Sequence, residues 1–89
     1  MRVKVYKAMK SPSNSSVVYV FIEEDKDIKD IDIPVPVKDR LGDLRQVNSL
    51  EINHGEKRIA LDADEAINNI NNTGYHIQGV GMNLTLADH

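Results

Sequence analysis

The chain opens on a period-two pattern, in which apolar Met1, Val3 and Val5 alternate with charged or polar neighbours. Such alternation predicts a half-buried strand whose cationic face meets water. Residues 17–22, VVYVFI, are apolar at every position and rich in β-branched and aromatic side chains, which is typical of a central strand covered on both faces. Residues 11–16, SPSNSS, favour a turn, so the two strands are predicted to pair as an antiparallel hairpin.

The middle of the chain predicts a short helix followed by an irregular strand. In IPVPVKDRLG the prolines fit only the start of a helix, so one or two helical turns are expected at Val35 to Leu41. Gly42 would then be a left-handed C-cap. From Leu44 to Ile52 the apolar positions indicate a strand whose alternation breaks once, which permits a β-bulge or a register change. A glycine-containing turn and a short extended piece follow, so residues 44–61 are a candidate second hairpin.

The clearest helix signal is LDADEAINNINNTG, residues 61–74. Asp62 and Glu65 form an acidic capping box at the helix N-terminus, and Gly74 supplies the C-cap. The apolar stripe that would pack on a sheet consists of Ala63, Ala66, Ile67 and Ile70. The side chains expected to face solvent are Asn68, Asn69, Asn71 and Asn72. Because asparagine is a poor helix former, this helix is expected to depend on packing against the sheet.

A final strand is predicted at Tyr75 to Val80. The 89 residues have the size of one small domain. Together the elements predict an α+β fold, with a small, mainly antiparallel sheet of four to five strands and one short and one longer helix packed on it. This single domain is expected to span residues 1–80, and residues 81–89 to form a flexible C-terminal tail.

Composition narrows the class of protein. The chain is 40% hydrophobic and 28% charged, which is the ordinary range for a globular domain. It has no cysteine, which removes disulfides and thiolate catalysis and fits a reducing cytoplasm. No apolar run reaches the roughly 18 residues of a membrane span. We therefore expect a cytoplasmic protein without a membrane partner.

Charge is distributed unevenly along the chain. The formal net charge is −3, yet the first 22 residues contain four basic side chains and no acid. Residues 23–32, EEDKDIKDID, contain six acids and two lysines. Charge runs most often form a solvated surface, and a docking surface for a partner is the alternative. The negative net charge argues weakly against nucleic acid as the main partner.

Several short features follow one another over residues 1–78. They are Tyr6 with Lys7 and then Lys10, Tyr19-Val20 in the second strand, Ile33-Pro34 eight residues before Leu41-Gly42, Ile52, Asp62 opening a helix, and Gly74-Tyr75 followed by Ile77-Gln78. In these features the chain resembles the YcgL-domain family, small bacterial proteins of unknown function. The resemblance implies a small α/β domain with helices packed on a sheet, and it brings no established activity. The chain departs from the family pattern at Ala8 and Met9 and, where the family has prolines, at Gly79 and Gly81.

Histidines and carboxylates give little sign of chemistry. His54 lies in a predicted turn, and His76 is expected on the sheet face opposite Tyr75, near Gln78, as a packing or surface residue. The acidic run has the first spacing of a calcium loop, but it lacks the required glycine and carries Lys29 at the third ligand position. We therefore predict no catalytic residue, no metal site and no cofactor, and we expect the protein not to be an enzyme.

The charge layout leads to two main hypotheses for function. The first is a non-enzymatic protein-interaction module, whose basic strand and adjacent acidic loop contact an unknown protein partner or a second copy of the chain. The alternative is an RNA-binding accessory protein that uses the basic N-terminal strand and loop, with Tyr6 as an aromatic for base stacking. An enzyme that uses His76 with an acid is a third possibility. The predicted partner-binding residues are Arg2, Lys4, Tyr6, Lys7, Lys10, Glu23, Glu24 and Asp25.

Overall fold

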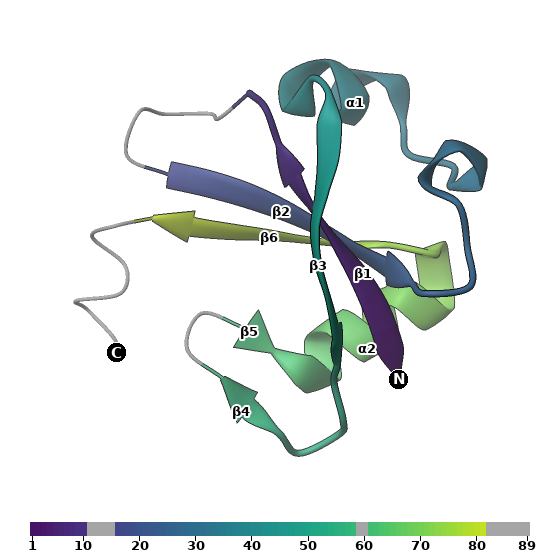
Figure 1. The fold of residues 1–89 in the computed structure, drawn as a ribbon, viewed down its shortest axis with the longest axis vertical. Coiled ribbons are helices and arrows are strands. Elements are labelled where there is room, and N and C mark those ends of the chain that lie inside the picture. The colour runs from purple at the N-terminus through teal and green to yellow at the C-terminus, as the bar shows by residue number, and fades with distance from the viewer. Residues whose placement is uncertain (11–15, 59–60, 82–89) are drawn as a thin grey trace.

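A computed structural model of the chain describes residues 1–10, 16–58 and 61–81. Its main feature is a four-stranded antiparallel sheet (Figure 1). In spatial order the strands are β3 (Leu44–Glu51), β1 (Arg2–Ala8), β2 (Ser16–Glu23) and β6 (His76–Gly81). The other elements are the 3₁₀-helix η1 (Ile28–Asp30), the helices α1 (Val35–Leu41) and α2 (Ala63–Thr73), and a two-stranded sheet of β4 (Lys57–Arg58) and β5 (Leu61–Asp62). This architecture confirms the predicted α+β fold.

Each face of the sheet packs against a helix. In Figure 1, α1 and α2 lie on opposite sides of β2 and β6. One cluster of buried residues joins Val5 and Phe21 to the apolar stripe of α2, and a second joins Val20 to Leu41 of α1. β1 and β2 form the predicted antiparallel pair, with Val5 opposite Phe21. Because β2 supplies residues to both clusters, it is the predicted central strand with an element packed on each face, although Tyr19 within it is half-buried.

Helix α2 forms as its sequence predicts. The Asp62 side chain accepts a hydrogen bond from the Glu65 N–H at 3.2 Å and so caps the helix. Gly74 ends the helix in the left-handed conformation, with φ 92°, and donates its N–H to the Ile70 carbonyl at 2.8 Å. Glycine adopts this φ without the steric cost of a Cβ. The predicted stripe is buried, but Asn69 is half-buried and not solvent-facing as expected.

Helix α1 is the short helix that the prolines predict. It begins after Pro34 and ends at Gly42, whose φ is 68° and whose N–H donates to the Lys38 carbonyl at 2.9 Å. Leu41 is its buried residue. The helix therefore covers the sheet through its last turn, and its polar side chains stay on the surface.

Strand β3 contains the predicted bulge but not the predicted hairpin. Along β1, Val5 lies opposite Asn48 and Tyr6 opposite Gln46, so Val47 is the extra residue. The candidate hairpin over residues 44–61 is wrong, because β3 pairs with β1 while β4 pairs with β5. Pairing with β1 brings the two ends of β3 to the two clusters of buried residues, and a local hairpin would not.

Two predicted segments fall largely outside the described residues. Residues 11–15 of the expected loop and residues 82–89 of the expected tail belong to this part of the chain. Within the described ranges, no helix is long and apolar enough to cross a membrane.

Candidate binding surface

The basic residues at the start of β1 are held by the acidic segment that follows β2. Where β2 ends, the chain turns back so that residues 23–32 begin beside the start of β1. The Arg2 guanidinium forms an ion pair with Glu24, Nη2 to Oε2 at 3.2 Å. Lys4 Nζ donates a hydrogen bond to the Lys26 carbonyl. Arg2 and Lys4, which were predicted to bind another molecule, therefore already interact with groups of the same chain.

Tyr6 is buried, which corrects the prediction of a solvent-exposed stacking aromatic. Its side chain is 8% exposed and packs in the cluster that contains Val20 and Leu41. The period-two pattern placed Tyr6 on the correct face of β1, but the segment from η1 to α1 covers that face and excludes water from the ring. Tyr6 therefore belongs to the core, where no base can stack on it.

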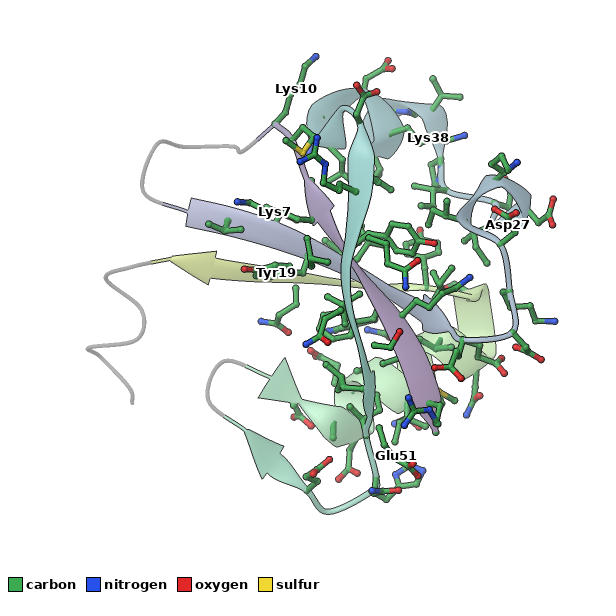
Figure 2. All side chains as sticks on the ribbon, in the orientation of Figure 1. Lys7, Lys10, Tyr19, Asp27, Lys38 and Glu51 are labelled. Carbon is green, nitrogen blue, oxygen red and sulfur yellow. The ribbon has the colours of Figure 1, made fainter. Side chains whose placement is uncertain are left out.

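Lys7 and Lys10 lie at the other end of β1 from Arg2. Both are exposed, and Figure 2 shows Lys7 on the opposite side of the molecule from Asp27 of the acidic segment and Lys10 beside α1. Across the described ranges, neither lysine forms an ion pair or a side-chain hydrogen bond. The acidic members of the predicted set, Glu23, Glu24 and Asp25, stay near the start of β1. The structure thus divides the predicted partner-binding residues into two separate regions.

One line of side chains crosses all four strands on the α2 face of the sheet. Lys7 in β1 lies directly opposite Arg45 in β3. On its other side Lys7 lies opposite Tyr19 in β2, which in turn lies opposite Gln78 in β6. Directly opposed residues of antiparallel strands point to the same face of the sheet. We call these four residues the open row, because Lys7 and Arg45 are exposed and the other two are half-buried.

A second line runs beside the open row on the same face. It consists of Val5, Phe21 and His76, which are also directly opposed across β1, β2 and β6. We call it the buried row, because Phe21 is 6% and His76 3% exposed. Asn48 of β3 continues this line at the exposed edge of the sheet. Val5 and Phe21 pack in the cluster that contains the stripe of α2, so the helix covers this line.

His76 links the two rows through hydrogen bonds. Its Nδ1 lies 2.9 Å from Asn69 Nδ2 of α2, and its Nε2 lies 3.1 Å from Gln78 Oε1. The Asn69 amide nitrogen can only donate, so Nδ1 accepts and the Nε2–H donates to Gln78. The ring also packs against Phe21, with centroids 5.8 Å apart. Of the two predicted roles for His76, packing or surface, the structure shows a packing residue near Gln78. Its contact with Nδ1 also explains the half-buried position of Asn69.

Two cations oppose each other in the open row. Lys7 and Arg45 are direct cross-strand partners, and like charges in such positions lower stability. In the part of the chain that the structure describes, neither Lys7 nor Arg45 has a carboxylate in ion-pair distance. Asp43 is close to this region, since its carbonyl accepts the Met9 N–H at 2.8 Å, but its side chain forms no ion pair with them. Among residues 1–10, 16–58 and 61–81, no carboxylate therefore compensates this pair of charges.

The sequence profile of the YcgL domain matches residues 3–79. This chain belongs to the YcgL domain family. No curated protein and no solved structure matches it. All four residues of the open row lie within the matched span, so the row is part of the YcgL domain itself.

Three members of the open row were missed in the sequence. Tyr19 and Gln78 carry part of the family resemblance, and Gln78 is expected near His76, but neither is among the predicted partner-binding residues, and Arg45 has no predicted role. Their alignment depends on strand order and on the bulge at Val47, because in a regular ladder Gln46 would lie opposite Lys7 in place of Arg45. The break in apolar alternation between Leu44 and Ile52 was the one sequence signal for this shift.

The second histidine of the described YcgL domain lies in an exposed turn. His54 Nδ1 is 2.9 Å from Asp64 Oδ1, which also accepts the Gly55 backbone N–H at 2.9 Å. The Gly55 N–H and the His54 ring lower the pKa of the Asp64 carboxyl below its ordinary value. These contacts tie the turn after β3 to the first turn of α2. In the described segments, no group of three or more histidine, aspartate or glutamate side chains could hold a metal ion.

Proposed function

We propose that this YcgL domain is a non-catalytic interaction module that binds an acidic partner with its basic end. The observation that carries this proposal is the cross-strand pair of Lys7 and Arg45, which are exposed and lack a carboxylate partner in the described residues. An acidic ligand between the two side chains would replace their repulsion by attraction. Arg2, by contrast, already has Glu24 as its partner, so the start of β1 is a weaker candidate.

The basic end extends beyond the open row. Lys10 follows β1, and its backbone N–H donates to the Leu41 carbonyl at 3.0 Å, which holds it at the end of α1. The last turn of α1 carries Lys38 and Arg40, and Figure 2 shows Lys10 and Lys38 both beside this helix. We define the basic end as Lys7, Lys10, Lys38, Arg40 and Arg45. Its acidic neighbours along the chain are Asp39 and Asp43, so positive charge is in excess.

Charge of one sign on one end of a small domain steers an oppositely charged partner and sets its orientation. The screening length in physiological salt is about 8 Å, so a ligand at the basic end responds to these nearby cations more than to the net charge of the whole chain. The negative total of −3 is therefore compatible with an acidic partner.

The non-catalytic part of the proposal is supported by the surroundings of the histidines. Both ring nitrogens of His76 have hydrogen-bond partners inside the fold, and His54 is engaged with Asp64 in the turn. A general base needs a nitrogen within reach of a substrate proton. The cysteine-free sequence also supports a cytoplasmic location for this activity.

Retention on heparin, a sulfated polyanion, tests the proposal. We expect the protein to bind the resin, and Lys7→Glu and Arg45→Glu to elute at clearly lower salt. Lys29→Glu is the matched control, because it changes the net charge equally at a side chain that is 84% exposed in the acidic segment. Equal elution shifts for all three variants, or no retention of the unmodified protein, would refute the assignment of the basic end.

A further inference from the structure

Tyr19 places a partly accessible aromatic ring in the open row, which the binding of an acidic group by Lys7 and Arg45 does not require. Phe21 and Tyr19 are two residues apart on β2 and point to the same face, yet Phe21 is 6% exposed while Tyr19 is half-buried. The Tyr19 ring packs at the margin of the α2 cluster. Figure 2 shows its hydroxyl end pointing in the same direction as the ammonium end of Lys7. An aromatic side chain with a partly accessible ring therefore stands between a cation and an amide.

The spacing of the open row suits an extended ligand that carries both negative charges and planar aromatic rings. Strands lie about 4.8 Å apart, so Arg45 and Tyr19 on either side of Lys7 are separated by roughly 10 Å. Proteins that bind single-stranded nucleic acid combine cations that follow the phosphates with aromatic side chains on which bases stack. Four-stranded antiparallel sheets can present such aromatics on one face, where two or three bases lie flat. The open row has both components on adjacent strands.

Gln78 adds a fixed hydrogen-bonding group on the far side of Tyr19. Its Oε1 accepts from the buried His76 ring and its Nε2 donates to the Gly79 carbonyl at 3.2 Å. An amide has two N–H groups and two oxygen lone pairs, so one donor and one acceptor position are left for a ligand. The ribose 2′-hydroxyl is both a donor and an acceptor, and it distinguishes RNA from DNA. The His76 contact holds this amide in place before any ligand arrives.

We infer that the open row binds single-stranded RNA, with one base stacked on Tyr19, phosphates at Lys7 and Arg45, and Gln78 on the ribose or base edge. This inference rests on the proposed binding of an acidic partner at the basic end. The sequence alone predicted RNA binding on the face of β1 that carries Tyr6, whereas the open row lies on the opposite face of the sheet. An acidic peptide would satisfy Lys7 and Arg45 but would leave the aromatic and the amide without a role.

The test is fluorescence anisotropy with a labelled oligouridine of about ten nucleotides at about 50 mM salt, where phosphate contacts contribute most. We expect Tyr19→Leu to weaken binding by about tenfold to a hundredfold, since a stacked base contributes about 1–3 kcal/mol. Tyr19→Phe keeps a ring for stacking and should bind as the unmodified protein does. Lys7→Gln should weaken binding and reduce the slope of log affinity against log salt by about 0.7, the value for one phosphate contact on a single strand.

Control measurements separate the possible failures. Tyr19→Leu should leave heparin retention unchanged, because heparin has no bases, and circular dichroism checks that this variant is folded. If oligouridine does not bind but polyglutamate does, the RNA inference is overturned while the proposed acidic partner stands. If oligodeoxyuridine, the DNA with the same bases, binds as tightly as oligouridine, the assignment to RNA is overturned. If neither polyanion nor heparin binds, both proposals are overturned.

Discussion

The open row and the buried row lie side by side on one face of the sheet, but α2 covers the buried row and leaves Lys7 and Tyr19 of the open row accessible to solvent. Both take directly opposed residues from β1, β2 and β6. In the buried row, Val5, Phe21 and His76 lie under α2 or form a hydrogen bond to it. In the open row, Lys7 and Tyr19 occupy the next positions on the same strands and reach solvent. The extent of one helix therefore decides which side chains stabilise the fold and which are available to a ligand.

The largest difference between the rows is expected from truncating their aromatic residues. Phe21→Ala should lower the free energy of unfolding by about 3–5 kcal/mol, because a buried aromatic is lost and a cavity is left. Tyr19→Ala should cost about 1–2 kcal/mol, because only part of this side chain is removed from water. Urea unfolding of both variants checks this order. Equal losses would show that Tyr19 is a core residue and that the open row is not open.

Removing the His76 hydrogen bonds that join the two rows is expected to have the next largest effect on the free energy of unfolding. His76→Leu leaves the amides of Asn69 and Gln78 without their buried partner, and it should lower the free energy of unfolding by about 1–3 kcal/mol. His54→Leu in the exposed turn is the matched control and should change stability less. Oligouridine binding should weaken in His76→Leu, because Gln78 is no longer held, and should be unchanged in His54→Leu. A larger loss of stability in His54→Leu would contradict the structural role of His76.

Charge reversal in the open row should stabilise the fold while it removes binding. Lys7→Glu turns the pair with Arg45 into an attractive one, so the free energy of unfolding should rise by about 0.2–1 kcal/mol. Arg45→Glu should do the same, and the double variant should lose the gain because two like charges again face each other. Thermal unfolding at low salt measures these differences, which added salt should reduce. Destabilisation by both single variants would mean that another group already compensates the two cations.

Removing a positive charge at the start of β1 should have the opposite effect on stability and no effect on binding. Arg2→Gln removes the ion pair with Glu24, an exposed pair of the kind that contributes about 0.2–1 kcal/mol or less. Stability should fall slightly, and retention on heparin and affinity for oligouridine should not change. A loss of affinity equal to that of Lys7→Gln would place the binding surface at both ends of β1.

The smallest effect concerns Asp64, a carboxylate outside both rows, and it depends on pH. The lowered pKa of Asp64 means that its contacts with Gly55 and His54 stabilise the folded state while the carboxyl is ionised. This contribution should be complete above the ordinary value of 3.8 and should be lost as pH falls through the lower value in the folded protein. Asp64→Asn should therefore be less stable than the unmodified protein at neutral pH, with a difference that disappears in acid. Unfolding curves from neutral pH to about pH 2 test this trend, and a difference that grows in acid would contradict it.

Local patterns in the sequence predicted most elements of the fold. The caps at Asp62 and Gly74 predicted α2, and the unbroken apolar run of residues 17–22 predicted the central strand. Parity along β1 predicted the face on which Tyr6 lies, but not its burial, because parity does not say whether another element covers that face. Contacts between segments that are distant in the sequence determine which strand pairs with β3. They also determine that Arg45, and not Gln46, lies opposite Lys7. The open row could not be predicted, because it exists only once four strands are aligned.

An NMR titration of isotope-labelled protein with oligouridine tests the central claim most directly. We predict that the amide and side-chain signals of Lys7, Tyr19, Arg45 and Gln78 shift together as RNA is added, while those of Arg2 and Glu24 stay in place. Shifts confined to the start of β1 and the acidic segment, or no shifts at an RNA concentration that saturates known single-strand binders, would contradict the assignment of the open row as the binding surface.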